Sequence, residues 1–151
     1  MNSNYINVLL ADDDIDDCRF FKKALEELQL STHLAIVHDG EELMKYLDEH
    51  LAQLPDVLFL DLSMPRKTGF ECLTEIKEND TLKNLPVIVF TTSFVKGISY
   101  EKGLANTLTR IGAEEYIRKP SDFEQLKRII SKVILRVQKK IINVDIENIP
   151  D

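Results

Sequence analysis

The stretch Asp56–Pro65, DVLFLDLSMP, sets the pattern by which the rest of the chain can be interpreted. The apolar run Val57–Leu60 is followed at once by the carboxylate of Asp61 and then by a turn. A short apolar run without alternation is typical of a strand buried on both faces, as in a parallel sheet. An acid directly after such a strand is therefore expected at the carboxyl edge of a sheet.

Similar apolar runs recur along the chain and alternate with segments of helical periodicity. The five predicted strands are Ile6–Ala11, Leu34–Val37, Val57–Leu60, Val87–Phe90 and Tyr116–Ile117. Five strands alternating with five helices predict an α/β fold, a parallel sheet with helices on both faces. In such sheets, functional groups gather beyond the carboxyl ends of the strands, at the point where the strand order reverses.

Several helix starts carry local signals. Asp14 precedes a segment of helical period and is a predicted N-cap. Thr68 and Glu71 have the spacing of a capping box at the start of the third helix. Ser121 and Glu124 have the same spacing at the start of the last helix.

Length and composition narrow the class of protein. A chain of 151 residues fits one domain, and its net charge of -7 argues against broad binding to nucleic acid or anionic membranes. We find no signal peptide and no apolar stretch long enough to span a bilayer, so the expected location is the cytoplasm. Cys18 and Cys72 lie in apolar helical patterns and are expected to be buried and reduced.

The residues that end the predicted strands have complementary chemistry. They are Asp12, Asp13, Asp61, Thr91 and Lys119. Two or three carboxylates at close range repel each other unless a cation joins them, and Mg²⁺ suits such oxygen ligands. A carboxylate can also attack phosphorus, and a lysine and a hydroxyl can then neutralise and bind the phosphoryl oxygens.

Other interpretations of these residues remain open from spacing alone. Each could be a cap, a turn residue or a surface residue when taken singly, and only their joint occurrence at strand ends favours a site. The acidic pair could be Asp12 and Asp13 or Asp13 and Asp14, and Thr92 competes with Thr91. Asp12 and Asp14 could also form the Asp-x-Asp pair of a phosphatase of the haloacid-dehalogenase type, although no cap-sized insertion is present.

At this point the sequence resembles the response-regulator receiver domains of two-component signalling, in particular the single-domain chemotaxis type. The resemblance covers roughly residues 5–137 and rests on four motifs. They are LADDD at 10–14, LDLSMP at 60–65 with Gly69 following, PVIVFTTS at 86–93, and Gly112-Ala113 leading to YIRKP at 116–120. It implies a flavodoxin-like, doubly wound five-stranded parallel sheet of order 2-1-3-4-5.

The resemblance also implies roles for the acidic residues and their neighbours. Asp61 matches the aspartate that accepts the phosphoryl group. Asp13 matches the direct ligand of Mg²⁺, Asp12 matches its partner acting through water, and Ser63 is expected to offer its backbone carbonyl to the metal.

Further roles follow for the hydroxyl, the lysine and an aromatic residue. Thr91 matches the hydroxyl that follows the phosphoryl group on activation. Lys119 matches the family's lysine, and its bond to Pro120 is expected to be cis. Tyr116 matches the aromatic switch position, which packs inward when the hydroxyl moves.

The expected protein is a stand-alone response regulator, a signalling module rather than an enzyme. Its receiver domain is predicted over 5–140, followed by a tail, 141–151, that is flexible or forms an extra strand or arm. Its implied partners are a sensor histidine kinase or histidine phosphotransfer protein and a downstream protein, with no nucleic acid or membrane. Segment 93–112 is longer than in compact receivers. Ile129 and Leu135 add apolar area off the main stripe of the last helix, which indicates a dimer or partner surface, and the expected oligomeric state is a monomer or a weak dimer.

Overall fold

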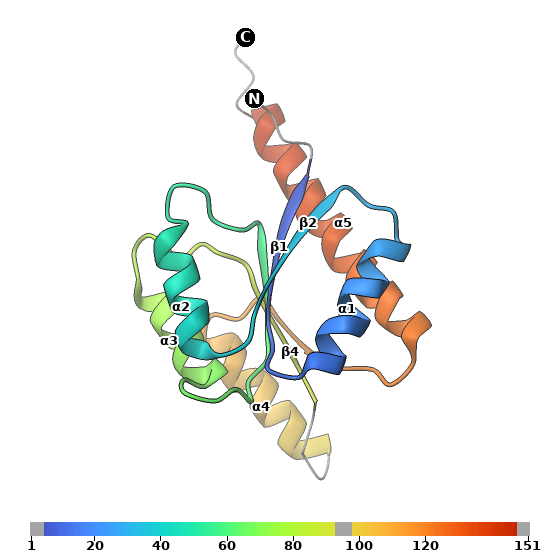
Figure 1. Ribbon diagram of the computed structural model, residues 1–151. Helices are drawn as coiled ribbons and strands as arrows, with labels where there is room; N and C mark the ends of the chain where they lie inside the picture. Colours follow the sequence, from blue (N-terminus) through green and yellow to red (C-terminus); the bar gives the residue numbers. More distant parts are fainter. Residues whose placement is uncertain (1–4, 93–97, 148–151) are drawn as a thin grey trace.

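The computed structural model describes residues 5–92 and 98–147, in which five strands alternate with five helices (Figure 1). The strands are β1 (Ile6–Ala11), β2 (Thr32–Val37), β3 (Val57–Leu60), β4 (Val87–Thr91) and β5 (Glu115–Arg118). The helices are α1 (Ile15–Glu27), α2 (Gly40–Glu49), α3 (Gly69–Glu78), α4 (Ile98–Ile111) and α5 (Phe123–Glu147).

The five strands form one parallel sheet of order β2-β1-β3-β4-β5. From β1 the chain passes to β2 on one side and then crosses to β3 on the other, so the strand order reverses between β1 and β3. Ala11 pairs with both Val37 and Leu60, which brings the ends of these three strands level. The predicted flavodoxin-like fold is confirmed, and the reversal lies where the acidic residues follow β1 and β3.

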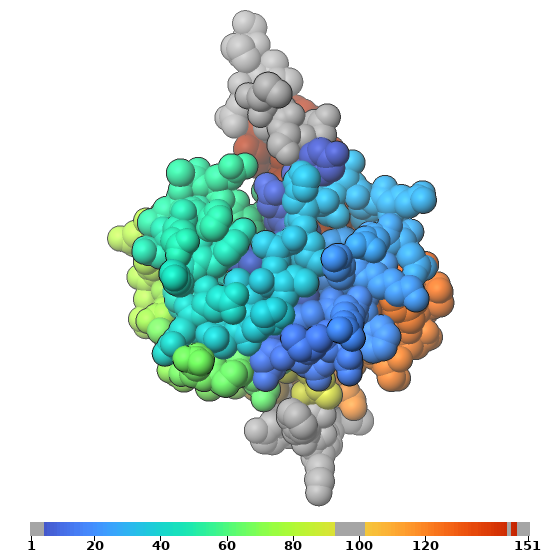
Figure 2. Space-filling model, in the orientation of Figure 1, coloured from blue at the N-terminus to red at the C-terminus, as the bar shows by residue number. Residues whose placement is uncertain are grey.

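Two apolar cores hold the helices against the sheet. Helices α2, α3 and α4 cover one face and α1 and α5 cover the other (Figure 1). Leu9 and Leu58 face the first core, whereas Val8 and Phe59 face the second, as expected for strands whose successive side chains alternate between faces. In the space-filling view, the side chains of α1, β2 and α2 form the surface at the β2 edge (Figure 2).

Two of the three predicted helix starts are confirmed. Asp14 accepts a hydrogen bond from the backbone N–H of Asp17 at 3.0 Å, and Thr68 and Glu71 form a complete capping box. The prediction for the last helix is wrong, because α5 begins at Phe123 and Asp122 accepts the N–H of Glu124 at 2.9 Å. An aspartate adjacent to the first helical residue is a better-placed acceptor than a serine one residue earlier.

Helix α5 is longer than expected. It continues to Glu147, so residues 141–147 are helical rather than a flexible tail, strand or arm. Ile129, expected at the surface, packs against the core, whereas Leu135 is 49% exposed. Residues 93–97 of the long segment before α4 lie outside the described residues, as does 148–151. No helix in the described part of the chain is sufficiently long and apolar to span a membrane.

Both cysteines are buried with free thiols, as predicted. The Cys18 thiol donates to the carbonyl oxygen of Asp12 and the Cys72 thiol donates to that of Gly40. Burial raises the pKa of Cys18 to about 12 and that of Cys72 to about 11. Because the thiolate is the reactive form, these side chains act as small core residues.

Candidate functional site

The ends of four strands place their polar residues at one edge of the sheet. Backbone hydrogen bonds continue past the strands, from the N–H of Asp61 to the carbonyl of Ala11 at 3.0 Å, and from the N–H of Lys119 to that of Thr91 at 2.9 Å. Asp61 is therefore fixed beside the end of β1, and Lys119 beside the end of β4. The sheet register itself sets the spacing of the site.

The ammonium group of Lys119 binds three carboxylates. Its Nζ lies 2.6 Å from Asp12 Oδ2, 2.8 Å from Asp17 Oδ2 and 3.3 Å from Asp61 Oδ2. Burial acts to lower the pKa of Lys119, but the hydrogen bonds to Asp12 and Asp17 outweigh it and the pKa is raised. The lysine is thus a permanent cation, with a side chain that is only 10% exposed.

Asp12 is the most buried of the carboxylates, with 1% of its surface exposed. Besides Lys119, it accepts the backbone N–H of Asp14 at 3.0 Å. Burial raises the pKa of Asp12 to about 6, although the hydrogen bonds to Lys119 and Asp14 act in the opposite direction, and the charge of Asp61 raises it further. A group with this pKa is still mainly ionised at neutral pH, where it repels Asp61.

Asp61 accepts two hydrogen bonds on one oxygen of its carboxylate. The hydroxyl of Thr91 donates to its Oδ1 at 2.6 Å, and the backbone N–H of Ser63 donates to the same oxygen at 3.3 Å. Thr92 is exposed, so Thr91 is the residue that enters the site. Asp61 is 6% exposed, which leaves its carboxylate confined but reachable at the surface of the sheet edge.

Three carboxylates converge closely enough to hold a cation. Asp12, Asp13 and Asp61 each offer an oxygen, and these oxygens lie within 4.8 Å of one another. Asp13 is exposed and opens the cluster to solvent, whereas Asp14 is used as the cap of α1. The structure thus brings together the Asp12–Asp13 pair rather than Asp13–Asp14. Hard oxygen donors with an open side fit Mg²⁺ or Mn²⁺.

The remaining predicted residues lie nearby, with one expectation overturned. Tyr116 is partly buried against the core beneath α4. That the backbone carbonyl of Ser63 binds the metal stays a prediction. The expected cis bond between Lys119 and Pro120 is wrong, because no peptide bond in the described residues is cis. The trans isomer is the lower-energy form of an X–Pro bond, and Lys119 reaches its carboxylates with it.

Asp17 is the site residue that sequence reasoning missed. It lies in the first turn of α1, where acidic residues are common because they favour the positive end of the helix dipole. Its contact with Lys119 joins residues 102 positions apart. No local signal distinguishes it from its exposed neighbour Asp16.

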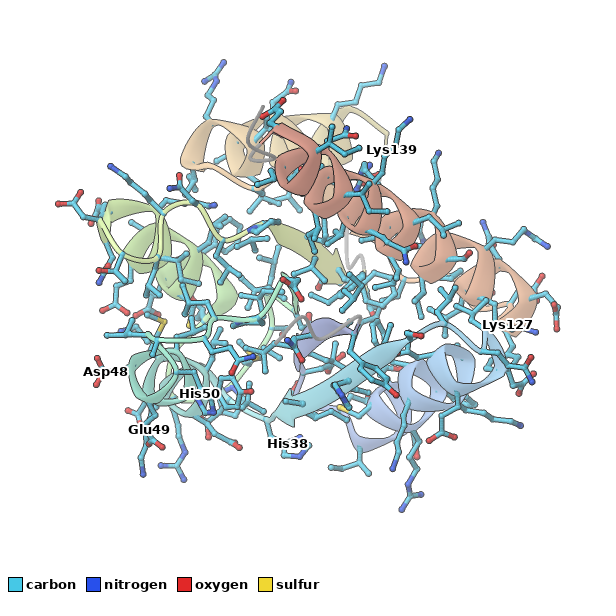
Figure 3. All side chains as sticks on the ribbon, turned by 90° about the horizontal axis from the view of Figure 1, so that it is seen from above. His38, Asp48, Glu49, His50, Lys127 and Lys139 are labelled. Atoms are coloured by element: carbon cyan, nitrogen blue, oxygen red, sulfur yellow. The ribbon has the colours of Figure 1, made fainter. Side chains whose placement is uncertain are left out.

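His38 contacts the main chain beside this cluster, whereas His50 packs on an aromatic ring of its own helix. His38 Nδ1 lies 3.2 Å from the backbone carbonyl of Asp12, and the ring of His50 stacks on Tyr46. His38 follows β2 and His50 is the C-cap of α2, and both lie on the same side of the molecule (Figure 3). They do not share a site with each other.

The family model of the response regulator receiver domain matches residues 8–131. The chain belongs to this family. This receiver is 30% identical over 129 residues to the probable methanogenesis regulatory protein FilR2 of Methanothrix harundinacea, covering 83% of this chain and 79% of that protein. It is 37% identical over 90 residues to the response regulator Rcp1 of Synechocystis sp., covering 57% of this chain but only 61% of that protein.

Solved structures extend the likeness across most of the receiver. The Mn²⁺-bound form of Rcp1 has 28% identity and a TM-score of 0.70, covering 84% of this chain and 90% of that chain. The phosphorylated cyanobacterial phytochrome response regulator RcpA has 32% identity and a TM-score of 0.72, covering 85% and 91%. These relatives place the chain among receivers in general rather than specifically among the chemotaxis type.

Proposed function

We propose that this receiver accepts a phosphoryl group onto Asp61 from a phosphohistidine and relays it as a change of its protein-binding surface. The observation that supports this most directly is the setting of Asp61, whose carboxylate lies between the Thr91 hydroxyl and the Lys119 ammonium. The donor is a sensor histidine kinase or a histidine phosphotransfer protein. The relative RcpA, whose structure is described as phosphorylated, is consistent with this chemistry.

The transfer needs little beyond positioning and neutralisation of charge. An oxygen of Asp61 attacks the phosphorus in line, the P–N bond breaks, and its electron pair returns to the imidazole, which takes up a proton. Lys119 neutralises charge on the transferred group. Thr91 then moves its hydrogen bond from Asp61 to a phosphoryl oxygen.

We propose that Asp12, Asp13 and Asp61, with the backbone carbonyl of Ser63, hold Mg²⁺. When bound, the ion supplies positive charge beside the phosphoryl oxygens. The relative Rcp1 was crystallised with Mn²⁺, an ion of similar ligand preference. The fit rests on this chain's own donors, three carboxylate oxygens that are close together and partly open to solvent.

This metal site predicts one change in Tm when Mg²⁺ is added and another when one of its carboxylates is removed. Millimolar Mg²⁺ should raise the Tm of the wild type, because the ion binds only the folded cluster. Asp13→Asn should raise the metal-free Tm by on the order of 2 °C, since it relieves repulsion, and should abolish the further rise with Mg²⁺. Differential scanning calorimetry in EDTA and in Mg²⁺ measures both. If Mg²⁺ raised the Tm of the variant as much as that of the wild type, Asp13 would not be a ligand of the ion.

We propose that the signal leaves through Tyr116 and the surface around α4 and β5. Tyr116 pairs with Val89 in the sheet, two residues before Thr91, and packs against the core that includes Leu108. A movement of Thr91 toward the phosphoryl group opens space that Tyr116 can enter. The read-out is then binding of a downstream protein by a stand-alone cytoplasmic regulator, with the receiver over 5–140.

The phosphatase alternative finds less support. Its Asp-x-Asp pair requires Asp12 and Asp14 to face a common substrate, but Asp14 accepts the N–H of Asp17 as the cap of α1. Steady turnover of a small phosphate ester would favour that alternative. Stoichiometric labelling of one residue favours the receiver.

The acceptor is tested by mass spectrometry after incubation with acetyl phosphate and MgCl₂. The wild type should gain the mass of one phosphoryl group, and Asp61→Asn should abolish the gain, because an amide oxygen is a far weaker nucleophile. Asp16→Asn, the same change at an exposed acid of α1, should label as the wild type does. Full labelling of Asp61→Asn would mean that another residue accepts the phosphoryl group.

A further inference from the structure

Asp17 is held in place by the start of α1. Its backbone N–H donates to the cap residue Asp14 at 3.0 Å, which fixes the first turn of the helix. Its carboxylate lies 2.8 Å from the Nζ of Lys119. The Asp17 side chain is 35% exposed, compared with 2% for Asp12 and 8% for Asp61. It is the most accessible of the three carboxylates that bind this lysine.

The three contacts use the full donor capacity of the lysine. An ammonium group has three N–H donors. Asp12, Asp17 and Asp61 each accept one, and the contact with Asp61 is the longest of the three. A phosphoryl group on Asp61 needs the same ammonium, so its oxygens must compete with the carboxylates of Asp12 and Asp17 for the N–H donors of Lys119.

Charge acts in the same direction as hydrogen bonding. Asp17 and Asp61 bind the same nitrogen, so their contacting oxygens lie no more than about 6 Å apart. A phosphoryl group adds roughly -1.5 to -2 charges beside Asp61. Asp17 therefore repels the phosphoryl group while also attracting the cation that stabilises it.

We propose that Asp17 is a positioning residue that holds Lys119 toward α1 and so weakens the binding of the phosphoryl group at Asp61. This inference rests on the proposed function of Asp61. Asp12 is buried and is also a metal-site carboxylate, whereas Asp17 is half-exposed and can be rehydrated when it releases the lysine. The strength of the Asp17–Lys119 contact thus sets how firmly the phosphorylated state is held.

The test is the affinity of the metal-loaded protein for beryllofluoride, a tetrahedral mimic of a phosphoryl group, measured by isothermal titration calorimetry at saturating Mg²⁺. Asp17→Asn should bind beryllofluoride about three- to ten-fold more tightly than the wild type. Asp16→Asn removes the same charge from the same turn at an exposed position and should change the affinity less than about two-fold. Asp17→Glu restores a carboxylate and should return the affinity toward that of the wild type.

A second readout reports on the lysine itself. The NMR resonance of the Lys119 ammonium should shift in metal-free Asp17→Asn and keep its position in Asp16→Asn. Urea unfolding of each variant verifies that it folds. A contact that only tied α1 to the residues after β5 would change stability without tightening beryllofluoride binding.

The outcomes separate this inference from the proposed function. Equal affinities of Asp17→Asn and Asp16→Asn, or weaker binding by Asp17→Asn, overturn the role given to Asp17 while leaving Asp61 as the acceptor. Failure of the wild type to bind beryllofluoride with Mg²⁺ overturns the acceptor and this inference together. The role given to Asp17 is supported if Asp17→Asn binds beryllofluoride more tightly than the wild type while Asp16→Asn and Asp17→Glu do not.

Discussion

Replacing Lys119 with methionine should lower the free energy of unfolding by about 3–5 kcal/mol at neutral pH in EDTA. Methionine keeps the apolar stem but removes the ammonium that lies 2.6 Å from Asp12 and 3.3 Å from Asp61. Two almost fully buried carboxylates would then face each other without their cation. Urea unfolding followed by circular dichroism measures the loss.

The loss should depend on pH in a defined direction. Burial already raises the pKa of Asp12 to about 6 with Lys119 present, and removing the lysine raises it further. A group whose pKa is higher in the folded than in the unfolded state contributes stability at low pH and loses it as the pH rises. The deficit of Lys119→Met should therefore be largest at and above neutral pH and should shrink as the pH falls to about 6, because below that pH Asp12 is protonated in both proteins.

Lys127→Met is the matched control. Lys127 lies on α5 at the outside of the molecule (Figure 3), and its ion pairs to Glu27 and Glu124 are 3.4 and 3.7 Å long at partly exposed positions. Such pairs contribute at most about 1 kcal/mol. Equal destabilisation by the two substitutions would mean that Lys119 does not neutralise the buried carboxylates.

The site residues at the strand ends could be predicted from sequence, because the carboxyl ends of parallel strands lie at the same edge of the sheet. A polar residue lies at or just after the end of each of four strands, so topology alone brings Asp12, Asp61, Thr91 and Lys119 to one edge. The choice between overlapping acids could not be made in this way. It is decided by the cap of α1, which uses Asp14 and leaves the preceding pair to the site.

What sequence could not supply are contacts between distant elements. Asp17 contacts Lys119 only because α1 and the end of β5 lie side by side. In the sequence, Asp17 looks like any other acidic residue in the first turn of a helix. The length of α5 was missed for a related reason. Ile141 packs against the core of α1 and α5, and this tertiary contact favours helix where the sequence offers no clear stop.

Gly69→Ala should destabilise the protein by about 2–3 kcal/mol, because a Cβ at this position would lie 2.3 Å from the carbonyl oxygen of Asp61 and 2.7 Å from the Cα of Leu62. Both are backbone atoms and cannot move without displacing the acceptor loop, so the rise of Tm with Mg²⁺ should also be reduced. Gly103→Ala makes the same chemical change inside α4, where a Cβ meets nothing within 4 Å, and should instead stabilise by about 0.5–1 kcal/mol. Urea unfolding of the two variants compares the signs directly. A neutral Gly69→Ala with an intact Mg²⁺ response would show that α3 can move away from Asp61 at little cost.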